Sequence, residues 1–125
     1  MTEAAYGFSP TLVASTVGDE YVIEIMREYL NTVNVILHFP ELISCDRESD
    51  LMLCLHTIKS ASLMVGAVKA GEWAASLEKT GERLQSPKRD EWIQDLNQFK
   101  IYLANNVEKI NRFLQSRGDS SLKAN

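Results

Sequence analysis

The chain has 125 residues, the size of a single domain that can bury its own core. Hydrophobic residues make up 45% and charged residues 24%, which excludes a disordered or fibrous protein. The formal net charge is -4 and the basic residues are scattered along the chain, so the charge gives no support to nucleic-acid binding.

Membrane and secretion signals are also missing from the sequence. No stretch has the length of uninterrupted apolar residues that a membrane span needs, and the N-terminus lacks a basic region followed by an apolar one. The two cysteines, Cys45 and Cys54, do not make a disulfide framework, and we expect reduced thiols that act as small apolar residues. The sequence therefore predicts a soluble, cytoplasmic protein with no membrane contact.

Helical spacing of apolar residues dominates the chain, and strand signals are weak. A short first helix is expected from Ser9-Pro10 to about Thr16, because Ser suits an N-cap and Pro suits a first turn. A second helix should start near Asp19-Glu20, two acids at the positive end of the helix dipole, and end or kink at Pro40. Its apolar stripe consists of Val22, Ile25, Met26, Tyr29, Val33, Ile36 and Leu37.

Three more helices are expected, over about 50–65, 68–84 and 88–115, with Gly66 as the residue that ends the first of them. Residues 117–125 are polar, and we expect a flexible tail there. Four long amphipathic helices joined by short connections predict an all-α fold, an up-down-up-down four-helix bundle with a short additional N-terminal helix. We expect one domain over 1–125, with its core at about 9–115. The stripes of the last two helices are Ala70, Trp73, Ala74, Leu77, Gly81 and Leu84, then Trp92, Leu96, Phe99, Leu103, Val107, Ile110 and Leu114.

The helix over 50–65 is apolar on two sides. On a helical wheel one side carries Leu51, Leu55, Ile58, Ser62 and Val65, which predicts the core face. The other side carries Met52, Leu53, His56, Ser60, Leu63 and Met64, with Lys59 at its edge. Either this helix is buried all round, with His56 as a core residue, or the second side is an exposed docking surface. Because a four-helix bundle exposes part of every helix, the docking alternative is favoured.

His56 and Lys59 suggest a chemistry for this second side. Imidazole is a nucleophile at neutral pH, and its phosphorylated form is a strong phosphoryl donor. Lys59 lies one turn along, where its ammonium can neutralise phosphoryl oxygens. Ser60 is small enough to leave the approach open. We also expect no acid near His56 on that side, because a carboxylate there would repel phosphate.

The run HTIKSASLMVGA over residues 56–67 resembles the signature of histidine-containing phosphotransfer (HPt) domains. That signature has His, Lys three residues later, a small residue next and Gly ten after the His, with a Leu-Glu pair in the following helix, matched here by Leu77-Glu78. The resemblance implies that His56 is the phosphoacceptor, that Lys59 stabilises the phosphoryl group and that Gly66 ends the active helix. Ser60 stands where the family usually has Gly, a departure that could slow transfer or narrow the choice of partner.

The resemblance also implies partners. HPt domains exchange phosphoryl groups with the aspartate of a response-regulator receiver domain, which supplies the Mg²⁺, so we expect no cofactor or metal on this chain. The run over 63–67 also looks like HPt modules of chemotaxis-type kinases, so a sensor histidine kinase is a second expected partner. The partner should dock on Met52, Leu53, Leu63 and Met64.

The sequence thus predicts a monomeric phosphocarrier that relays phosphoryl groups through His56 in a two-component phosphorelay. It has neither a Gly-x-Gly-x-x-Gly run nor a Walker loop, so we expect no ATP binding and no autokinase activity. The main alternative is a non-catalytic interaction module that docks partners through the same apolar face, and another is a coiled-coil module built on the last helix. His38 lacks a lysine three residues on and is followed by Pro40, and Glu72, Glu78 and Glu82 are expected to form a solvated face.

Overall fold

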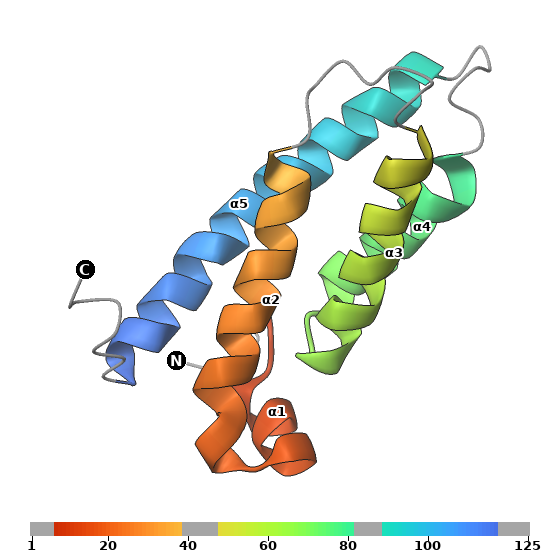
Figure 1. The fold of residues 1–125 in the computed structure, drawn as a ribbon. Coiled ribbons are helices and arrows are strands. Elements are labelled where there is room, and N and C mark those ends of the chain that lie inside the picture. The colour runs from red at the N-terminus through yellow and green to blue at the C-terminus, as the bar shows by residue number, and fades with distance from the viewer. Residues whose placement is uncertain (1–6, 39–47, 82–88, 118–125) are drawn as a thin grey trace.

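A computed structural model describes residues 7–38, 48–81 and 89–117, and every regular element within these ranges is a helix (Figure 1). The predicted all-α fold class is confirmed. Pro40, Cys45, Glu82, Leu84 and most of the expected tail lie outside the described residues. The elements in chain order are α1 Pro10–Val17, the short 3-10 turn η2 Asp19–Tyr21, α2 Val22–Leu37, α3 Glu48–Met64, α4 Val68–Thr80 and α5 Arg89–Ser116.

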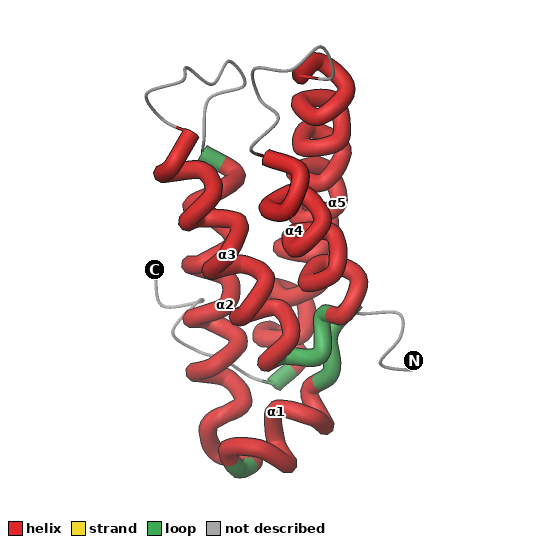
Figure 2. Tube along the Cα trace, turned by 90° about the vertical axis from the view of Figure 1, so that its right-hand side faces the viewer, coloured by secondary structure: helices red, strands yellow, loops and turns green. Residues whose placement is uncertain are grey.

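The four long helices enclose one shared core. Helix α2 packs against α3 and α5, and α4 packs against the same two helices, so each long helix has two neighbours. Helix α1 lies at one end of this group, against the start of α2 (Figures 1 and 2). No described helix combines the length and the apolar character needed to cross a membrane.

Of the first two helix starts, the sequence predicted one correctly and misplaced the other. Ser9 is the N-cap of α1, where its Oγ accepts the Leu12 N–H at 3.1 Å, as predicted. The second start was wrong by about one turn, because Asp19 and Glu20 form the 3-10 turn η2 and α2 begins only at Val22. Gly18 precedes that turn with a φ of 99°, a left-handed conformation that interrupts the helical path.

The end of α3 is fixed by Gly66, as the sequence predicts. Gly66 has a φ of 72°, its N–H donates to the Leu63 carbonyl, and the Ala67 N–H donates to the Ser62 carbonyl at 2.8 Å. This pair of bonds is a Schellman motif, which requires a left-handed residue. A Cβ at Gly66 would also lie 2.6 Å from the Cβ of Ser9, so the position has no room for a side chain.

The predicted stripes largely describe the core. On α5, every predicted stripe residue is buried except Val107, which is partly buried, and the buried Asn106 and Phe113 were not predicted. Trp73 of α4 is only partly buried, since its indole Nε1 donates to Asp95 at 2.9 Å at the border of the core. Cys54 is a free, partly buried thiol, and burial raises the pKa of Cys54 to about 11.

Candidate functional site

Helix α3 presents the predicted side to the core. The five residues of that side are each at most 1% exposed: Leu51, Leu55, Ile58, Ser62 and, directly after the helix, Val65. Because these residues face the core, the opposite side of α3 points away from α2 and α5. That side carries the histidine and is available to solvent or to a partner.

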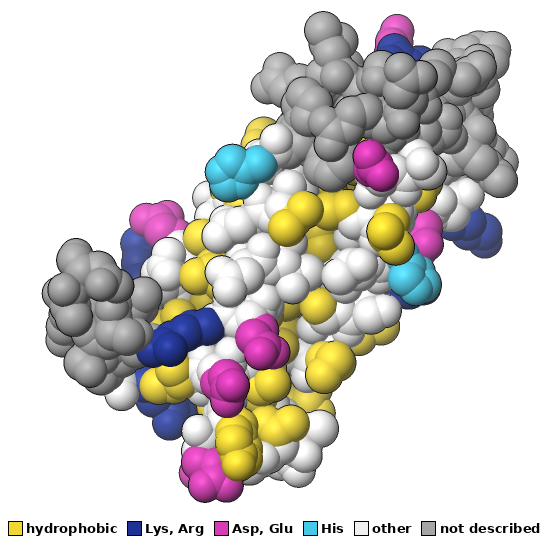
Figure 3. Space-filling view, viewed as in Figure 1, with side chains coloured by type: hydrophobic (Ala, Val, Ile, Leu, Met, Phe, Trp, Pro, Cys, Tyr) yellow, Lys and Arg dark blue, Asp and Glu magenta, His cyan; other side chains and the backbone are white. Residues whose placement is uncertain are grey.

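The imidazole of His56 stands at the surface, with 55% of its side chain exposed. Lys59, one turn along α3, is 31% exposed, and Ser60 is exposed beside it. The alternative in which α3 is buried all round is therefore wrong. Figure 3 shows the two histidine side chains of the chain, in cyan, at separate places on the surface.

A carboxylate from the neighbouring helix completes the site. Glu78 of α4 places Oε2 at 3.0 Å from Nδ1 of His56 and Oε1 at 3.7 Å from Nζ of Lys59. The expectations of a histidine without a nearby acid and of Glu78 on a solvated face are both wrong. Glu78 is only 29% exposed, because its side chain extends from α4 to the polar groups of α3. Glu72 is exposed, as predicted.

The contact with Glu78 determines which nitrogen of the His56 imidazole carries the proton. A carboxylate can only accept a hydrogen bond. Nδ1 of His56 must therefore carry a proton and donate the hydrogen bond to Oε2. In the neutral ring the lone pair then belongs to Nε2, on the other edge of a ring that is more than half exposed. The geometry leaves one nitrogen of His56 able to act as a nucleophile.

Glycine at position 71 lets α4 come close to this part of α3. A Cβ at Gly71 would lie 2.8 Å from Cδ2 of Leu63 and 3.5 Å from the backbone oxygen of Lys59. A larger residue there would push the helices apart at the level of the site. Sequence reasoning missed Gly71, although a glycine inside a predicted helix often marks such a close approach.

Exposed apolar side chains lie on the same side of α3 as the polar site. Leu53 is 66% exposed, Leu63 48% and Met64 60%, as expected for the predicted docking residues. Met52 differs, because it is partly buried and packs against the core beside Gly81. Two exposed residues that the sequence reasoning missed, Val68 at 54% and Leu12 at 41%, are apolar as well. We therefore leave Met52 out of the docking surface, defined from here on as Leu53, Leu63, Met64 and Val68.

His38 has a different setting at the end of α2. Its Nδ1 lies 2.6 Å from the carbonyl oxygen of Asn34, which accepts a hydrogen bond from the ring N–H. No ion pair joins His38 to another described residue. Within the described part of the chain, no group of three or more His, Cys, Asp or Glu side chains could hold a metal ion.

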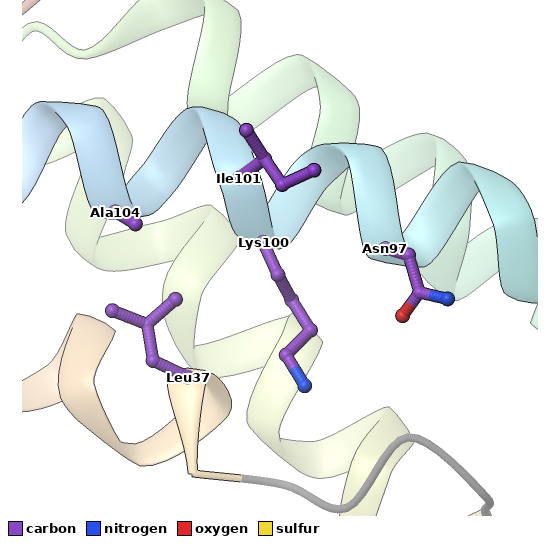
Figure 4. Close-up of a pocket in the computed structure, with 5 residues that line it drawn as sticks. All are labelled: Leu37, Asn97, Lys100, Ile101 and Ala104. Carbon is purple, nitrogen blue, oxygen red and sulfur yellow. The ribbon is translucent and has the colours of Figure 1, made fainter.

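An open pocket of about 430 Å³ lies elsewhere, between α2 and α5 (Figure 4). Its lining comes from Leu37, Asn97, Lys100, Ile101 and Ala104. None of these residues belongs to α3 or α4, so the pocket is separate from the His56 site. Ile101 of this pocket is 57% exposed.

Comparison with protein families gives one match, to the Hpt domain, over residues 20–112. The match covers most of the chain and includes α2, α3, α4 and nearly all of α5. The chain therefore belongs to the Hpt domain family. Neither curated proteins nor solved structures give a match.

Replacement of Glu78 tests whether it selects the tautomer of His56. In Glu78→Leu the acceptor for Nδ1–H is lost, and we expect the neutral ring to become a mixture of both tautomers. Glu78→Gln is the matched control, because its amide oxygen can still accept from Nδ1 without carrying charge. Long-range ¹⁵N NMR of the imidazole under mildly alkaline conditions reports both forms. Identical spectra for wild type and Glu78→Leu would contradict the assignment.

Proposed function

We propose that the chain carries a phosphoryl group on Nε2 of His56 and exchanges it with the aspartate of a response-regulator receiver domain. Membership of the Hpt family implies histidine phosphotransfer in phosphorelays. The observation that carries the residue assignment is the exposed imidazole of His56, held through Nδ1 by Glu78 with Lys59 alongside. A sensor histidine kinase is a second proposed partner, and we propose that the protein is monomeric and cytoplasmic.

The proposed transfer is a direct displacement at phosphorus. The Nε2 lone pair forms the N–P bond while the O–P bond to the receiver aspartate breaks, and the aspartate leaves as a carboxylate. The ring becomes positively charged as the bond forms, and the carboxylate of Glu78 stabilises that charge through Nδ1–H. The reverse reaction returns the group to an aspartate. The Mg²⁺ for this chemistry is expected on the receiver domain.

Lys59 is proposed to neutralise the phosphoryl oxygens. Its ammonium is one helical turn from His56 and has only a 3.7 Å contact with Oε1 of Glu78, too long for a good hydrogen bond. It can therefore turn toward an arriving phosphoryl group while Glu78 keeps its contact with Nδ1. Ser60 is proposed to leave space for the partner and to offer a hydroxyl.

The arrangement of the helices supports this proposal. We propose an up-down-up-down order, in agreement with the colour gradient along successive helices in Figure 1. In that order α3 and α4 are antiparallel neighbours joined at Gly66, so Glu78 near the end of α4 lies level with the middle of α3. The site is then formed on one helical hairpin.

A second candidate function is a non-catalytic interaction module. The exposed docking surface favours partner binding of some kind whether or not a phosphoryl group moves. This alternative predicts that His56→Gln retains both binding and signalling. The phosphocarrier predicts that His56→Gln retains binding and loses signalling.

Incubation with a phosphorylated receiver domain, or with a cognate kinase and ATP, tests the phosphocarrier. We expect an acid-labile, base-stable label on the wild type and none on His56→Gln, with His38→Gln labelled normally as the matched control. Lys59→Ala should keep the fold and slow transfer roughly 10- to 100-fold, the worth of a charge-assisted hydrogen bond. Label that persists in His56→Gln would overturn the proposal, and an unchanged rate in Lys59→Ala would remove the role of the lysine.

Docking through the apolar surface has its own test. Met64→Asp places a charge among the apolar contacts, and we expect affinity for the phosphorylation partner to fall roughly tenfold or more. Ile101→Asp changes a side chain of similar exposure in the pocket between α2 and α5, and should leave affinity unchanged. Titration calorimetry measures both. Equal losses in the two variants would contradict docking on α3 and α4.

A further inference from the structure

Helix α3 is apolar on its buried side and on much of its exposed side. Leu51, Leu55 and Ile58 face the core, whereas Leu53 and Leu63 face outward. The hydrophobic effect is non-directional. The pattern of apolar residues on α3 therefore favours the observed orientation only weakly over one in which the helix is rotated about its own axis. The active histidine nevertheless needs one orientation, since Glu78 must reach Nδ1.

A polar contact within the core favours the observed orientation, in addition to the polar side chains of His56, Lys59 and Ser60 on the exposed side. The hydroxyl of Tyr29 on α2 lies 2.8 Å from Oγ of Ser62 on α3, and the two residues are 3% and 0% exposed. Their helical neighbours one turn away, Met26, Val33, Ile58 and Val65, are all buried and apolar. The two hydroxyls therefore satisfy one another within an otherwise apolar interface.

Any rotation of α3 about its axis separates these two atoms. A one-residue change turns a helix by about 100°, which would leave the Tyr29 hydroxyl buried without its partner. One unsatisfied buried hydroxyl disfavours such an arrangement by roughly tenfold or more. Burial raises the pKa of Tyr29 to about 12, so the hydroxyl stays neutral and this contact does not titrate near neutral pH.

We propose that Tyr29 and Ser62 form a positioning pair that fixes the rotation of α3 and thereby aims His56 at Glu78. Ser62 lies three residues after Lys59 and six after His56 on one continuous helix, so its inward direction sets theirs. Its carbonyl also accepts the Ala67 N–H in the motif that ends α3. A role in transfer rests on the proposed function, whereas the effect on His56 geometry does not.

Removal of either hydroxyl leaves the other without its partner, but only the Ser62 hydroxyl has a second acceptor nearby. In Tyr29→Phe, the Ser62 hydroxyl can turn back to the carbonyl of Ile58, one turn earlier in α3. In Ser62→Ala the phenol of Tyr29 has no such local acceptor. We expect Ser62→Ala to lower the urea midpoint of unfolding more than Tyr29→Phe does. The double variant leaves no hydroxyl unpaired and should recover most of the midpoint.

The double variant Tyr29→Phe/Ser62→Ala separates positioning from stability. We expect it to fold, to lose the uniform Nδ1–H tautomer of His56 in ¹⁵N NMR, and to give more than one set of signals for α3. Ile110→Val, a small change in the buried part of α5, is the matched control and should keep the wild-type tautomer. Transfer to a receiver should slow in the double variant and not in the control.

Two results would overturn the positioning role. One is a double variant with wild-type His56 signals, which would make the pair an ordinary core contact. The other is a double variant less stable than either single variant, because the hydroxyls would then stabilise the fold independently. The tautomer is measured without any phosphoryl donor. A wild type that has the uniform tautomer but accepts no phosphoryl group would therefore count against the proposed function and not against the positioning pair.

Discussion

The distance between α3 and α4 is the constraint on which the site depends. Glu78 contacts His56 and Lys59 from a different helix, 22 residues further along the chain than the histidine. That reach requires a tight connection at Gly66 and a glycine at position 71, where the backbone of α4 faces Leu63 directly. The close approach of α3 and α4 thus depends on two positions that carry no side chain.

The arrangement separates binding from reactivity. The proposed docking surface would supply apolar contact area. Glu78 meanwhile contacts both His56 and Lys59 in the resting protein. A partner that covers this surface would exclude water from the site. The contact between the imidazole and the carboxylate would then strengthen, because electrostatic interactions grow in a less polar environment.

The sequence predicted most of the helices, but it did not predict that Glu78 completes the site. Periodicity identified the buried side of α3 and its end at Gly66, since both follow from residues close in the chain. The role of Glu78 could not be derived that way, because helical spacing says nothing about which residues of separate helices meet. The Leu-Glu pair of the family signature did include Glu78. The spacing of acidic residues along that helix nevertheless predicted a solvated face. Met52 was misplaced for a similar reason, since α4 covers it beside Gly81.

The most direct test of the account is the identity of the nitrogen that carries phosphorus. Phosphorylated protein can be examined by ³¹P NMR together with ¹⁵N correlation spectra of the imidazole. The account predicts one phosphorus atom, bonded to Nε2 of His56, with the proton retained on Nδ1 beside Glu78. Phosphorus on Nδ1 of His56, or on His38, would contradict it.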